Sequence, residues 1–253
     1  YESILGTDIW KYNKAVKDKS VGQEAIESVL RQIIQVKVIG KEAAIEKVQL
    51  ETDEKEEADY RAKTVFDSIS AKDKQTQGIE LKVLSKIFEE NKLAQKMYNV
   101  QMGKLKIDYA ANTLSAAKVE LIYQAANAKN KETVKNTMSQ ILSEVTSSQN
   151  SFYTVAKNKT QADAIEYVIG NQDSRTNLAK AVVSLKKNQT SALIEEKDGF
   201  YIAHCIQTNS AALQQQYRNQ LVSEKQTESF QKTYKIWSDK FDVKVSKALL
   251  AAN

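Results

Sequence analysis

Few side chains in this chain belong to the types that catalysis or metal binding requires. The 253 residues include one histidine and one cysteine, His204 and Cys205. A single cysteine excludes a disulfide within the chain and a zinc site built from several cysteines. A single histidine excludes every metal motif that uses two histidines. No lysine or arginine close in sequence would lower the pKa of the Cys205 thiol, so we expect a buried, unreactive side chain.

Acidic pairs are the next candidates for chemistry, because two carboxylates can share acid and base roles. The pairs Glu56/Glu57 and Glu195/Glu196 lie in charged stretches that are typical of a solvated surface. The sequence has no glycine-rich phosphate loop and no nucleophile elbow. We therefore expect no metal, no cofactor and no catalysis by these groups.

Composition indicates a soluble, folded chain, with 42% hydrophobic and 27% charged residues. The net charge of +5 is dispersed and lacks a basic block, which argues against nucleic-acid binding. No apolar run reaches the roughly 18 residues that a transmembrane helix needs. No signal peptide is visible, but the chain begins without methionine, which leaves room for an export signal before residue 1.

The chain has only seven glycines and no proline, so few residues interrupt a helix. Long helices are therefore expected at both ends of the chain. After an entry segment over residues 1–20, Ser20 and Gln23 fit a capping box for a helix to about residue 45. Thr52 and Asp53 are expected to cap a charged helix. The later helices are predicted at residues 53–69, 79–104 and 210–238, with a polar loop or single turn between 72 and 78 and a last strand at 241–245.

The middle of the chain alternates between strand and helix patterns. Lys197, Asp198 and Gly199 form a turn signal in which Gly199 is free to adopt a positive φ. We expect strands at residues 118–123, 164–169, 192–194 and 200–206, and helices at 131–147, 152–156 and 175–185. A small sheet with helices therefore interrupts an otherwise helical chain.

Two short motifs in this middle part carry a resemblance to a known family. They are Leu185-Lys186-Lys187-Asn188-Gln189-Thr190 and Gly199-Phe200-Tyr201-Ile202. They resemble the last helix and final strands of a parvulin-type peptidyl-prolyl isomerase domain, and the flanking helices resemble the chaperone part of the PrsA and SurA foldases. The resemblance implies an α+β, predominantly helical fold. A SurA-like discontinuous helical domain, residues 1–114 completed by 209–253, would carry an inserted parvulin-like (FKBP-like) α/β domain, residues 115–208.

The resemblance also assigns positions of the isomerase site, one at a time. The family usually has a histidine in the first strand and another in the last strand. Those positions fall on Leu121 and Tyr201 here, and the loop position for Asp or Cys falls near Ala162 or Asp163. The aromatic of the proline slot corresponds to Leu178 and a neighbouring methionine to Ser174. We therefore expect a vestigial peptide-binding pocket without catalytic residues, formed by Leu121, Ala162, Ser174, Leu178 and Tyr201.

His204 does not replace the missing histidines, because it lies three residues after Tyr201 and points to the opposite face of a straight strand. Cys205 shares the face of Tyr201. Met97, Tyr98 and Met102 are candidates for contacts with unfolded chains, because methionine adapts to varied partners, although such residues more often belong to a core.

The sequence leaves three functions open. The leading hypothesis is an extracytoplasmic foldase-type chaperone that binds unfolded exported polypeptides. The alternative is an active but atypical parvulin-type peptidyl-prolyl cis-trans isomerase, and a third hypothesis is a structural scaffold that dimerises. The PrsA resemblance implies attachment to the outer face of a bacterial cell membrane through a lipid anchor, and it leaves a homodimer open.

Overall fold

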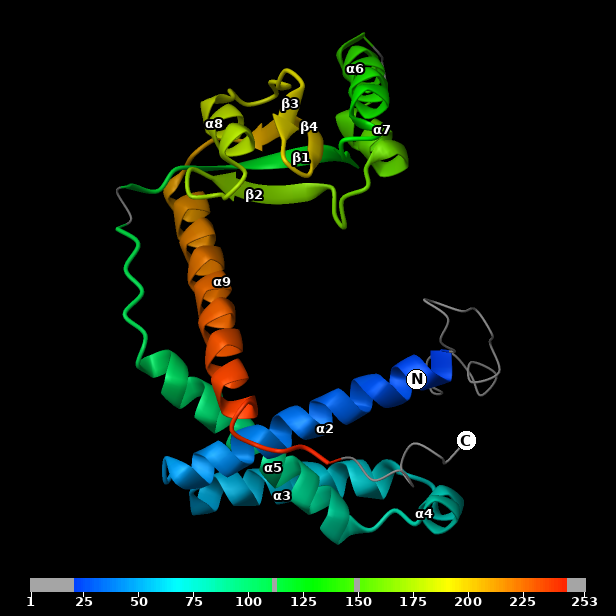
Figure 1. Ribbon diagram of the computed structural model, residues 1–253, viewed down its shortest axis with the longest axis vertical. Helices are drawn as coiled ribbons and strands as arrows, with labels where there is room; N and C mark the ends of the chain where they lie inside the picture. Colours follow the sequence, from blue (N-terminus) through cyan, green and yellow to red (C-terminus); the bar gives the residue numbers. More distant parts are fainter. Residues whose placement is uncertain (1–20, 111–112, 148–150, 245–253) are drawn as a thin grey trace. The chain divides into compact units, whose positions relative to one another are not determined.

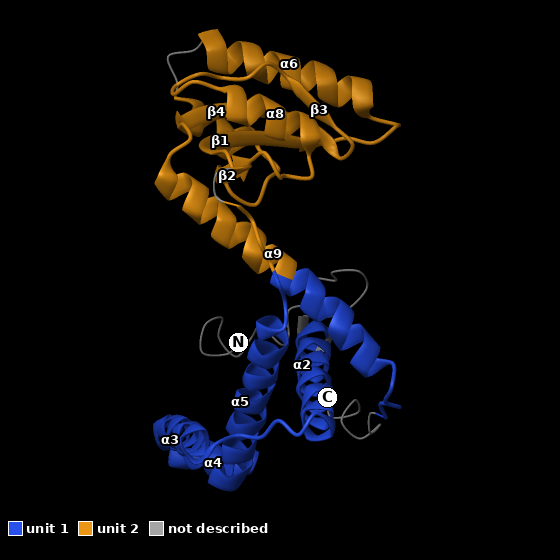
Figure 2. Cartoon of the chain, turned by 90° about the vertical axis from the view of Figure 1, so that its left-hand side faces the viewer, with its two compact units in different colours: residues 1–106, 226–253 blue, residues 107–225 orange. Residues whose placement is uncertain are grey.

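The computed structural model describes residues 21–110, 113–147 and 151–244. The chain divides into two compact units, which are described separately below (Figures 1 and 2). Unit 1 comprises residues 1–106 and 226–253, and unit 2 comprises residues 107–225. The domain boundaries expected from the sequence, at residues 114–115 and 208–209, remain a prediction. No helix in the described part of the chain is long and apolar enough to cross a membrane.

Unit 1 consists of helices: α2 (Val21–Ile45), α3 (Thr52–Ser68), α4 (Ala71–Gln77), α5 (Leu81–Gly103) and the second half of α9 (Ala211–Ser238). Its core brings α2, α5 and the end of α9 together. The buried side chains of this core are Val38, Ile39, Ala43, Met97 and Trp237. Phe230, Tyr234 and Phe241 pack against them.

The charged helix α3 packs on α5 through small residues and ion pairs. Ala58 and Ala62 are its buried residues, so the helix backbones can approach closely. Lys96 Nζ lies 2.6 Å from Glu54 Oε2, and Lys92 binds Glu57. A helix with this little apolar surface therefore depends on its neighbour for stability.

The helix starts in unit 1 differ in part from expectation. The N-cap of α3 is Glu51, not Thr52 or Asp53, and the Glu51 backbone N–H donates to Glu54 Oε2 at 2.8 Å. The Glu54 carboxylate, at the third helical position, thus supplies the cap that was predicted from Thr52 and Asp53. The polar stretch after residue 70 forms the short helix α4, which ends at Gly78 in the left-handed conformation. The expected cap at Ser20 lies outside the described residues.

Unit 2 is built on a four-stranded antiparallel sheet in the order β2-β1-β4-β3. The strands are β1 (Ala116–Ala125), β2 (Glu166–Gly170), β3 (Ile194–Glu196) and β4 (Gly199–Gln207). Helix α8 (Thr176–Ser184) covers one face, where Leu121, Leu178 and Tyr201 are buried together. Helices α6 (Lys131–Ser147) and α7 (Phe152–Lys159) cover the other face, where Ile122, Met138 and Ile202 are buried. The predicted α+β class is confirmed.

Two glycines of unit 2 are required by their surroundings. Gly199 has a φ of 155°, and a Cβ there would lie 2.1 Å from the Gln124 carbonyl oxygen, which confirms the predicted turn glycine. A Cβ on Gly170 would lie 2.3 Å from Cε1 of Tyr217, a buried residue in the first half of α9. The Gln172 backbone N–H donates to the Tyr217 hydroxyl at 3.1 Å, so the end of β2 is fixed to α9.

Two strand predictions are corrected by the structure. Residues 241–244 form no strand, and Val245 lies outside the described residues. Phe241 packs into the core of unit 1, so its apolar character reflects helix packing and not strand alternation. The third strand begins at Ile194 and not at Ala192. The Ser191 backbone N–H donates to the Ala203 carbonyl oxygen at 2.8 Å, but the Ala203 N–H donates to Ser191 Oγ at 3.0 Å, so a side chain replaces a backbone acceptor before the strand begins.

Candidate functional site

A small pocket on the α8 side of the sheet brings together three of the five residues predicted for a site. Leu121, Ala162 and Tyr201 line this hollow of about 190 Å³, which we call the tyrosine pocket. Its other lining residues are Tyr123, Gln161, Asp163, Tyr167 and Arg175. The loop after α7 reaches β1 because the Gln161 backbone N–H donates to the Tyr123 carbonyl oxygen at 2.8 Å.

The other two predicted residues lie elsewhere in unit 2. Leu178 points into the core under α8 and is fully buried. Ser174 precedes α8 and lines a larger hollow of about 840 Å³. Neither side chain lines the tyrosine pocket. The assignment of these five residues to a peptide-binding pocket remains a prediction.

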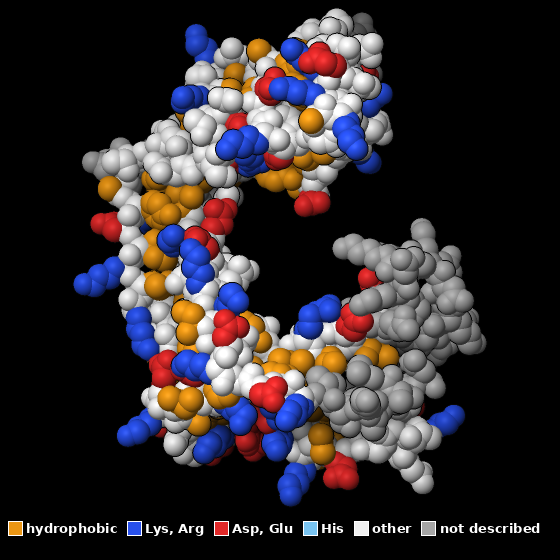
Figure 3. Space-filling model, viewed as in Figure 1, with side chains coloured by type: hydrophobic (Ala, Val, Ile, Leu, Met, Phe, Trp, Pro, Cys, Tyr) orange, Lys and Arg blue, Asp and Glu red, His pale blue; other side chains and the backbone are white. Residues whose placement is uncertain are grey.

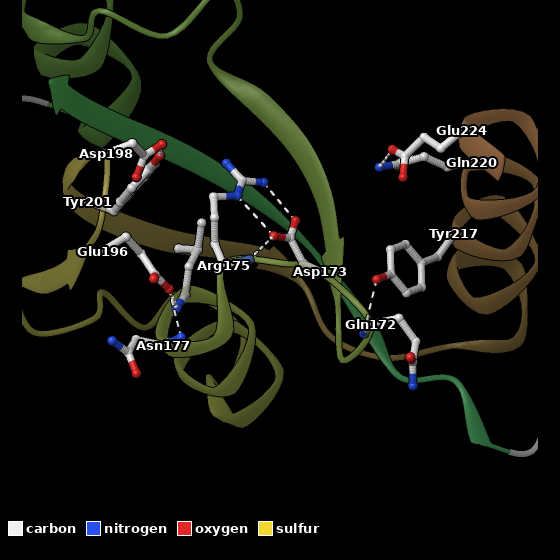
Figure 4. Close-up of polar contacts among 11 residues, drawn as sticks. Gln172, Asp173, Arg175, Asn177, Glu196, Asp198, Tyr201, Tyr217, Gln220 and Glu224 are labelled. Carbon is white, nitrogen blue, oxygen red and sulfur yellow. Dashed lines mark hydrogen bonds and ion pairs between the residues drawn. The ribbon is translucent and has the colours of Figure 1, made fainter. Parts of the chain in front are cut away.

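Tyr201 of β4 has defined partners in Tyr123 of β1 and in Asp198 of the β3–β4 turn, and Figure 4 shows the side chains of Tyr201 and Asp198 beside each other. Its ring stacks on Tyr123 with centroids 4.7 Å apart, and its hydroxyl donates to Asp198 Oδ2 at 2.5 Å. The side chain is only 3% exposed. Burial, together with Asp198, raises the pKa of Tyr201, so the phenol keeps its proton and acts as a donor.

Arg175 stands between Tyr201 and Asp173 at the start of α8. Its Nε and Nη2 donate to the two carboxylate oxygens of Asp173 at 2.9 and 2.7 Å, a bidentate pair that fixes the guanidinium plane. Its Cζ lies 5.6 Å from the centroid of the Tyr201 ring. The hydrogen bond from Arg175 to Asp173 raises the pKa of the guanidinium further, so this group is a permanent cation.

The first turn of α8 is capped from the β3–β4 hairpin. Glu196 Oε1 accepts from the backbone N–H groups of Asn177 and Leu178 at 2.7 and 2.9 Å. The neighbouring Glu195 is exposed and pairs with Lys131 at 2.6 Å. The acidic pair expected on a solvated surface is therefore split, because Glu196 caps a helix and only Glu195 faces solvent.

The larger hollow lies beside this cap, and we call it the polar groove. It is bounded by the loop between β1 and α6, the start of α8 and the β3–β4 turn. Its lining includes Asn127, Lys131, Asn177, Glu195, Asp198 and Phe200. Arg175 lines both the polar groove and the tyrosine pocket.

His204 and Cys205 lie outside this site. His204 stacks on Phe152 of α7 with ring centroids 5.3 Å apart, and its Nδ1 lies 2.9 Å from Thr190 Oγ1. It is thus on the face opposite to Tyr201, as expected, and burial lowers its pKa. Cys205 is buried in the cluster that contains Tyr201, and burial raises the pKa of its thiol. Within residues 21–110, 113–147 and 151–244, no group of three or more histidine, cysteine or acidic side chains is placed to hold a metal ion.

Sequence reasoning missed Arg175, Tyr123 and Tyr167. The two tyrosines follow from strand alternation, since Tyr123 lies two residues after Leu121 and Tyr167 pairs with Val119 across the sheet. Asp173 and Arg175 stand two residues apart directly before a helix, and this spacing indicates that the two side chains can form an ion pair.

Comparisons with known proteins identify the sheet-containing part. Residues 114–207 match the family model described as "Rotamase: PPIC-type PPIASE domain". A solved PpiC-type peptidyl-prolyl cis-trans isomerase domain is 21% identical, covers 40% of this chain and 98% of its own, and has a TM-score of 0.36. No curated protein sequence matches the chain at a significant level.

Foldase structures are similar over most of the chain. Peptidylprolyl isomerase PrsA from Bacillus anthracis is 15% identical, covers 86% of this chain and 99% of its own, and has a TM-score of 0.45. One of the two SurA-like chaperones of Campylobacter jejuni, PEB4 and Cj1289, is 12% identical, covers 94% of this chain and 92% of its own, and has a TM-score of 0.32.

Proposed function

We propose that this chain, whose residues 114–207 form a PPIC-type domain, is a PrsA- and SurA-like foldase-type chaperone that binds unfolded exported polypeptides outside the cytoplasm. The PPIC-type match supports a foldase. The main support for a chaperone is a set of exposed apolar side chains on unit 1. They are Ile26, Val29 and Ile33 of α2 and Val83 and Ile87 of α5, which are between 38% and 52% exposed.

These side chains gather at one end of a helix pair. Lys37 Nζ lies 2.5 Å from Glu90 Oε1, and Lys104 Nζ lies 2.8 Å from Glu46 Oε2. Helices α2 and α5 therefore run side by side in the same direction, so their first halves lie at the same end. Figure 3 shows hydrophobic side chains, in orange, over α2. Clustered exposed apolar residues are unusual on a monomeric protein and mark an interaction site.

The methionines do not belong to this surface. Met97 and Met102 are buried, and the Tyr98 ring packs edge-on against Phe230 with centroids 4.9 Å apart. Burial excludes Met97 and Met102 from direct contact with clients, and Met97 belongs to the core of unit 1, in line with the core alternative given for these residues. Tyr98 is half-buried, so a client contact there stays a prediction. Client contacts are assigned instead to the exposed residues of α2 and α5.

Weak or absent isomerase activity is part of the proposal. An isomerase lowers the barrier of about 18–20 kcal/mol to rotation of a peptide bond, and parvulins do so with the proline ring in an apolar slot. We infer that Leu121 and Tyr201 stand at the family's usual histidine positions, and their presence in one pocket supports this. Tyr201 takes up part of the slot, and the charged side chains of Asp163 and Arg175 line it, which favours a binding site over an active isomerase. An active but atypical isomerase remains the alternative.

Location and assembly complete the proposal. Export and attachment through a lipid anchor are implied by the PrsA resemblance. A scaffold that dimerises without affinity for unfolded chains is the competing explanation for the exposed residues on α2 and α5. Sedimentation of the protein with and without an unfolded client separates the two.

The test of the proposal is suppression of aggregation by surface variants. Val29→Asp with Ile33→Asp places charge on the apolar stripe of α2, so we expect suppression of the aggregation of a denatured model client to fall several-fold. Gln32→Asp with Gln35→Asp, at exposed polar positions of the same helix, is the matched control and should leave suppression unchanged. Equal suppression by both pairs would remove the support for client binding on this face.

A further inference from the structure

A row of polar side chains crosses the sheet of unit 2 on the face that carries α6 and α7. Glu120 of β1 lies directly opposite Glu166 of β2 and directly opposite His204 of β4, and Thr190 pairs with His204 on its other side. Side chains at directly opposite positions of adjacent strands project from the same face, with Cβ atoms about 4.5–5.5 Å apart. The row therefore places two carboxylates and the single imidazole of the chain side by side.

The row lies between two apolar regions of this face. Ile122 and Ile202, each two residues from the row, are buried in the cluster under α6 and α7. Val168, on the other side, is buried in the cluster that contains the first part of α9. Glu120 and His204 are only half-buried between the two clusters. A small ligand can therefore reach the row from solvent and would be partly enclosed there.

Glu120 is the residue of the row that packing does not explain. Its carboxylate makes no hydrogen bond or ion pair with any residue that the structure describes. Lys118, which lies two residues before it on the same face, pairs with Glu166 instead, with Nζ 2.5 Å from Oε2. Like charges at directly opposite positions of a sheet repel each other. A cation close to both carboxylates would remove this repulsion.

His204 is held in the way that metal-ligating histidines are held. Its ring stacks on Phe152 with centroids 5.3 Å apart, and its Nδ1 lies 2.9 Å from Thr190 Oγ1. A histidine that binds a metal almost always donates from its other ring nitrogen to an oxygen, which fixes the tautomer and the orientation of the ring. With Nδ1 directed to Thr190, Nε2 is the nitrogen left to coordinate.

We propose that Glu120 and His204 Nε2 bind a divalent transition-metal ion on this face of the sheet, and that Glu166 exchanges Lys118 for the ion as a third ligand. Imidazole nitrogen together with carboxylate oxygen suits Zn²⁺, whereas Mg²⁺ and Ca²⁺ take oxygen ligands. In the described structure Glu166 is turned to Lys118, so the three ligands do not meet at one point. Rotation of this side chain, which is 46% exposed, completes the site. The inference does not depend on the proposed function.

Metal titrations of the full chain, without a histidine tag, test the inference. Co²⁺ that replaces Zn²⁺ in such a site has visible absorption bands that differ from those of the hydrated ion, and calorimetry with Zn²⁺ gives the affinity. The variants of the row are Glu120→Gln, His204→Gln, Glu166→Gln and Lys118→Met. Glu132→Gln and Lys135→Met are the matched controls, because both residues are exposed on α6 and lie outside the row. Cys205→Ala tests whether the neighbouring thiol takes part.

We expect the natural sequence to bind one ion per chain and to unfold at a higher temperature when Zn²⁺ is added. Loss of an outer-shell partner of a metal ligand costs about 10–100-fold in affinity, so loss of a ligand itself, in Glu120→Gln or His204→Gln, should weaken binding at least tenfold and abolish the Co²⁺ bands. Glu166→Gln should weaken binding several-fold. Lys118→Met should strengthen it several-fold, because Glu166 then has no competing partner, whereas the two controls and Cys205→Ala should leave it unchanged.

Three results would overturn the inference. The first is the absence of both the Co²⁺ bands and the Zn²⁺ heat with the natural sequence. The second is binding that survives both Glu120→Gln and His204→Gln, or that Cys205→Ala abolishes, since the ion would then lie elsewhere. The third is an equal effect of Lys118→Met and Lys135→Met, which would show only a general attraction of cations to the chain. Circular dichroism of each variant distinguishes loss of a ligand from loss of the fold.

Discussion

The Tyr201 hydroxyl donates to Asp198 Oδ2 at 2.5 Å across the turn that joins β3 to β4. The Tyr201 ring is also stacked on Tyr123 of β1. A buried phenol whose hydroxyl makes a hydrogen bond avoids the free-energy cost of a buried unpaired polar group. The position that the parvulin resemblance gives to a histidine is thus used to hold the sheet and the turn together.

The cap that Glu196 places on α8 is the first feature to test. Removal of the carboxylate in Glu196→Ala leaves the N–H groups of Asn177 and Leu178 without their acceptor. We expect the free energy of unfolding to fall by about 0.5–2 kcal/mol, as for loss of an N-cap. Glu195→Ala, which removes only an exposed ion pair with Lys131, should cost much less. Urea denaturation of both variants measures the difference, and equal losses would contradict the role given to Glu196.

Alanine substitutions at Gly170, which contacts Tyr217, and at Gly40, which has open space around it, should change the stability of the protein in opposite directions. Gly170→Ala pushes a methyl group into the Tyr217 ring and toward the Ser115 carbonyl oxygen, so it should destabilise the protein by about 1–3 kcal/mol. Gly40→Ala lies inside α2 with nothing within 4 Å of the new Cβ, so it should stabilise by about 0.5–1 kcal/mol. Thermal unfolding compares the two. A neutral Gly170→Ala would mean that α9 is not fixed to the end of β2.

Buried tyrosines predict a loss of stability at alkaline pH. Burial raises the pKa of Tyr217 to about 12, against 10 for a free tyrosine. The unfolded chain therefore releases this proton first, so stability is complete below pH 10 and declines as the pH rises toward 12. Tyr217→Phe should flatten that decline in urea denaturation at a series of pH values. Tyr153→Phe, at an exposed tyrosine, is the control and should leave the slope unchanged.

The ion pair between Glu42 and Lys240 predicts a non-additive result. Glu42 is only 3% exposed, its Oε1 accepts from Lys240 Nζ at 2.7 Å, and its Oε2 is buried without a hydrogen-bond partner. Lys240→Met leaves this carboxylate uncompensated and should cost at least about 1 kcal/mol. Glu42→Gln in the same chain should restore much of that loss. Losses that simply add in a double-mutant cycle would contradict the coupling.

Periodicity was enough to predict the regular elements but not the site. The apolar stripe of α6 and the alternation in β4 fix which side chains face inward, and both elements lie where expected. The pocket depends instead on which loop reaches β1 and on how α8 begins. Leu178 was expected in the slot, yet the helix turns it into the core, while Arg175 at the N-cap takes the place beside Tyr201. Of the strand predicted at residues 241–245, residues 241–244 form no strand, because alternation of apolar residues alone does not supply a partner strand.

The proposed function is tested most sharply by the refolding of a denatured substrate whose slow phase is limited by proline isomerisation, followed together with its aggregation. We predict that the protein suppresses aggregation and leaves the rate of the slow phase unchanged, because Tyr201 occupies the slot. Tyr201→Ala, which empties that position, should not restore isomerisation, since no histidine replaces it. A slow phase that the protein accelerates would contradict the proposal and establish an atypical isomerase.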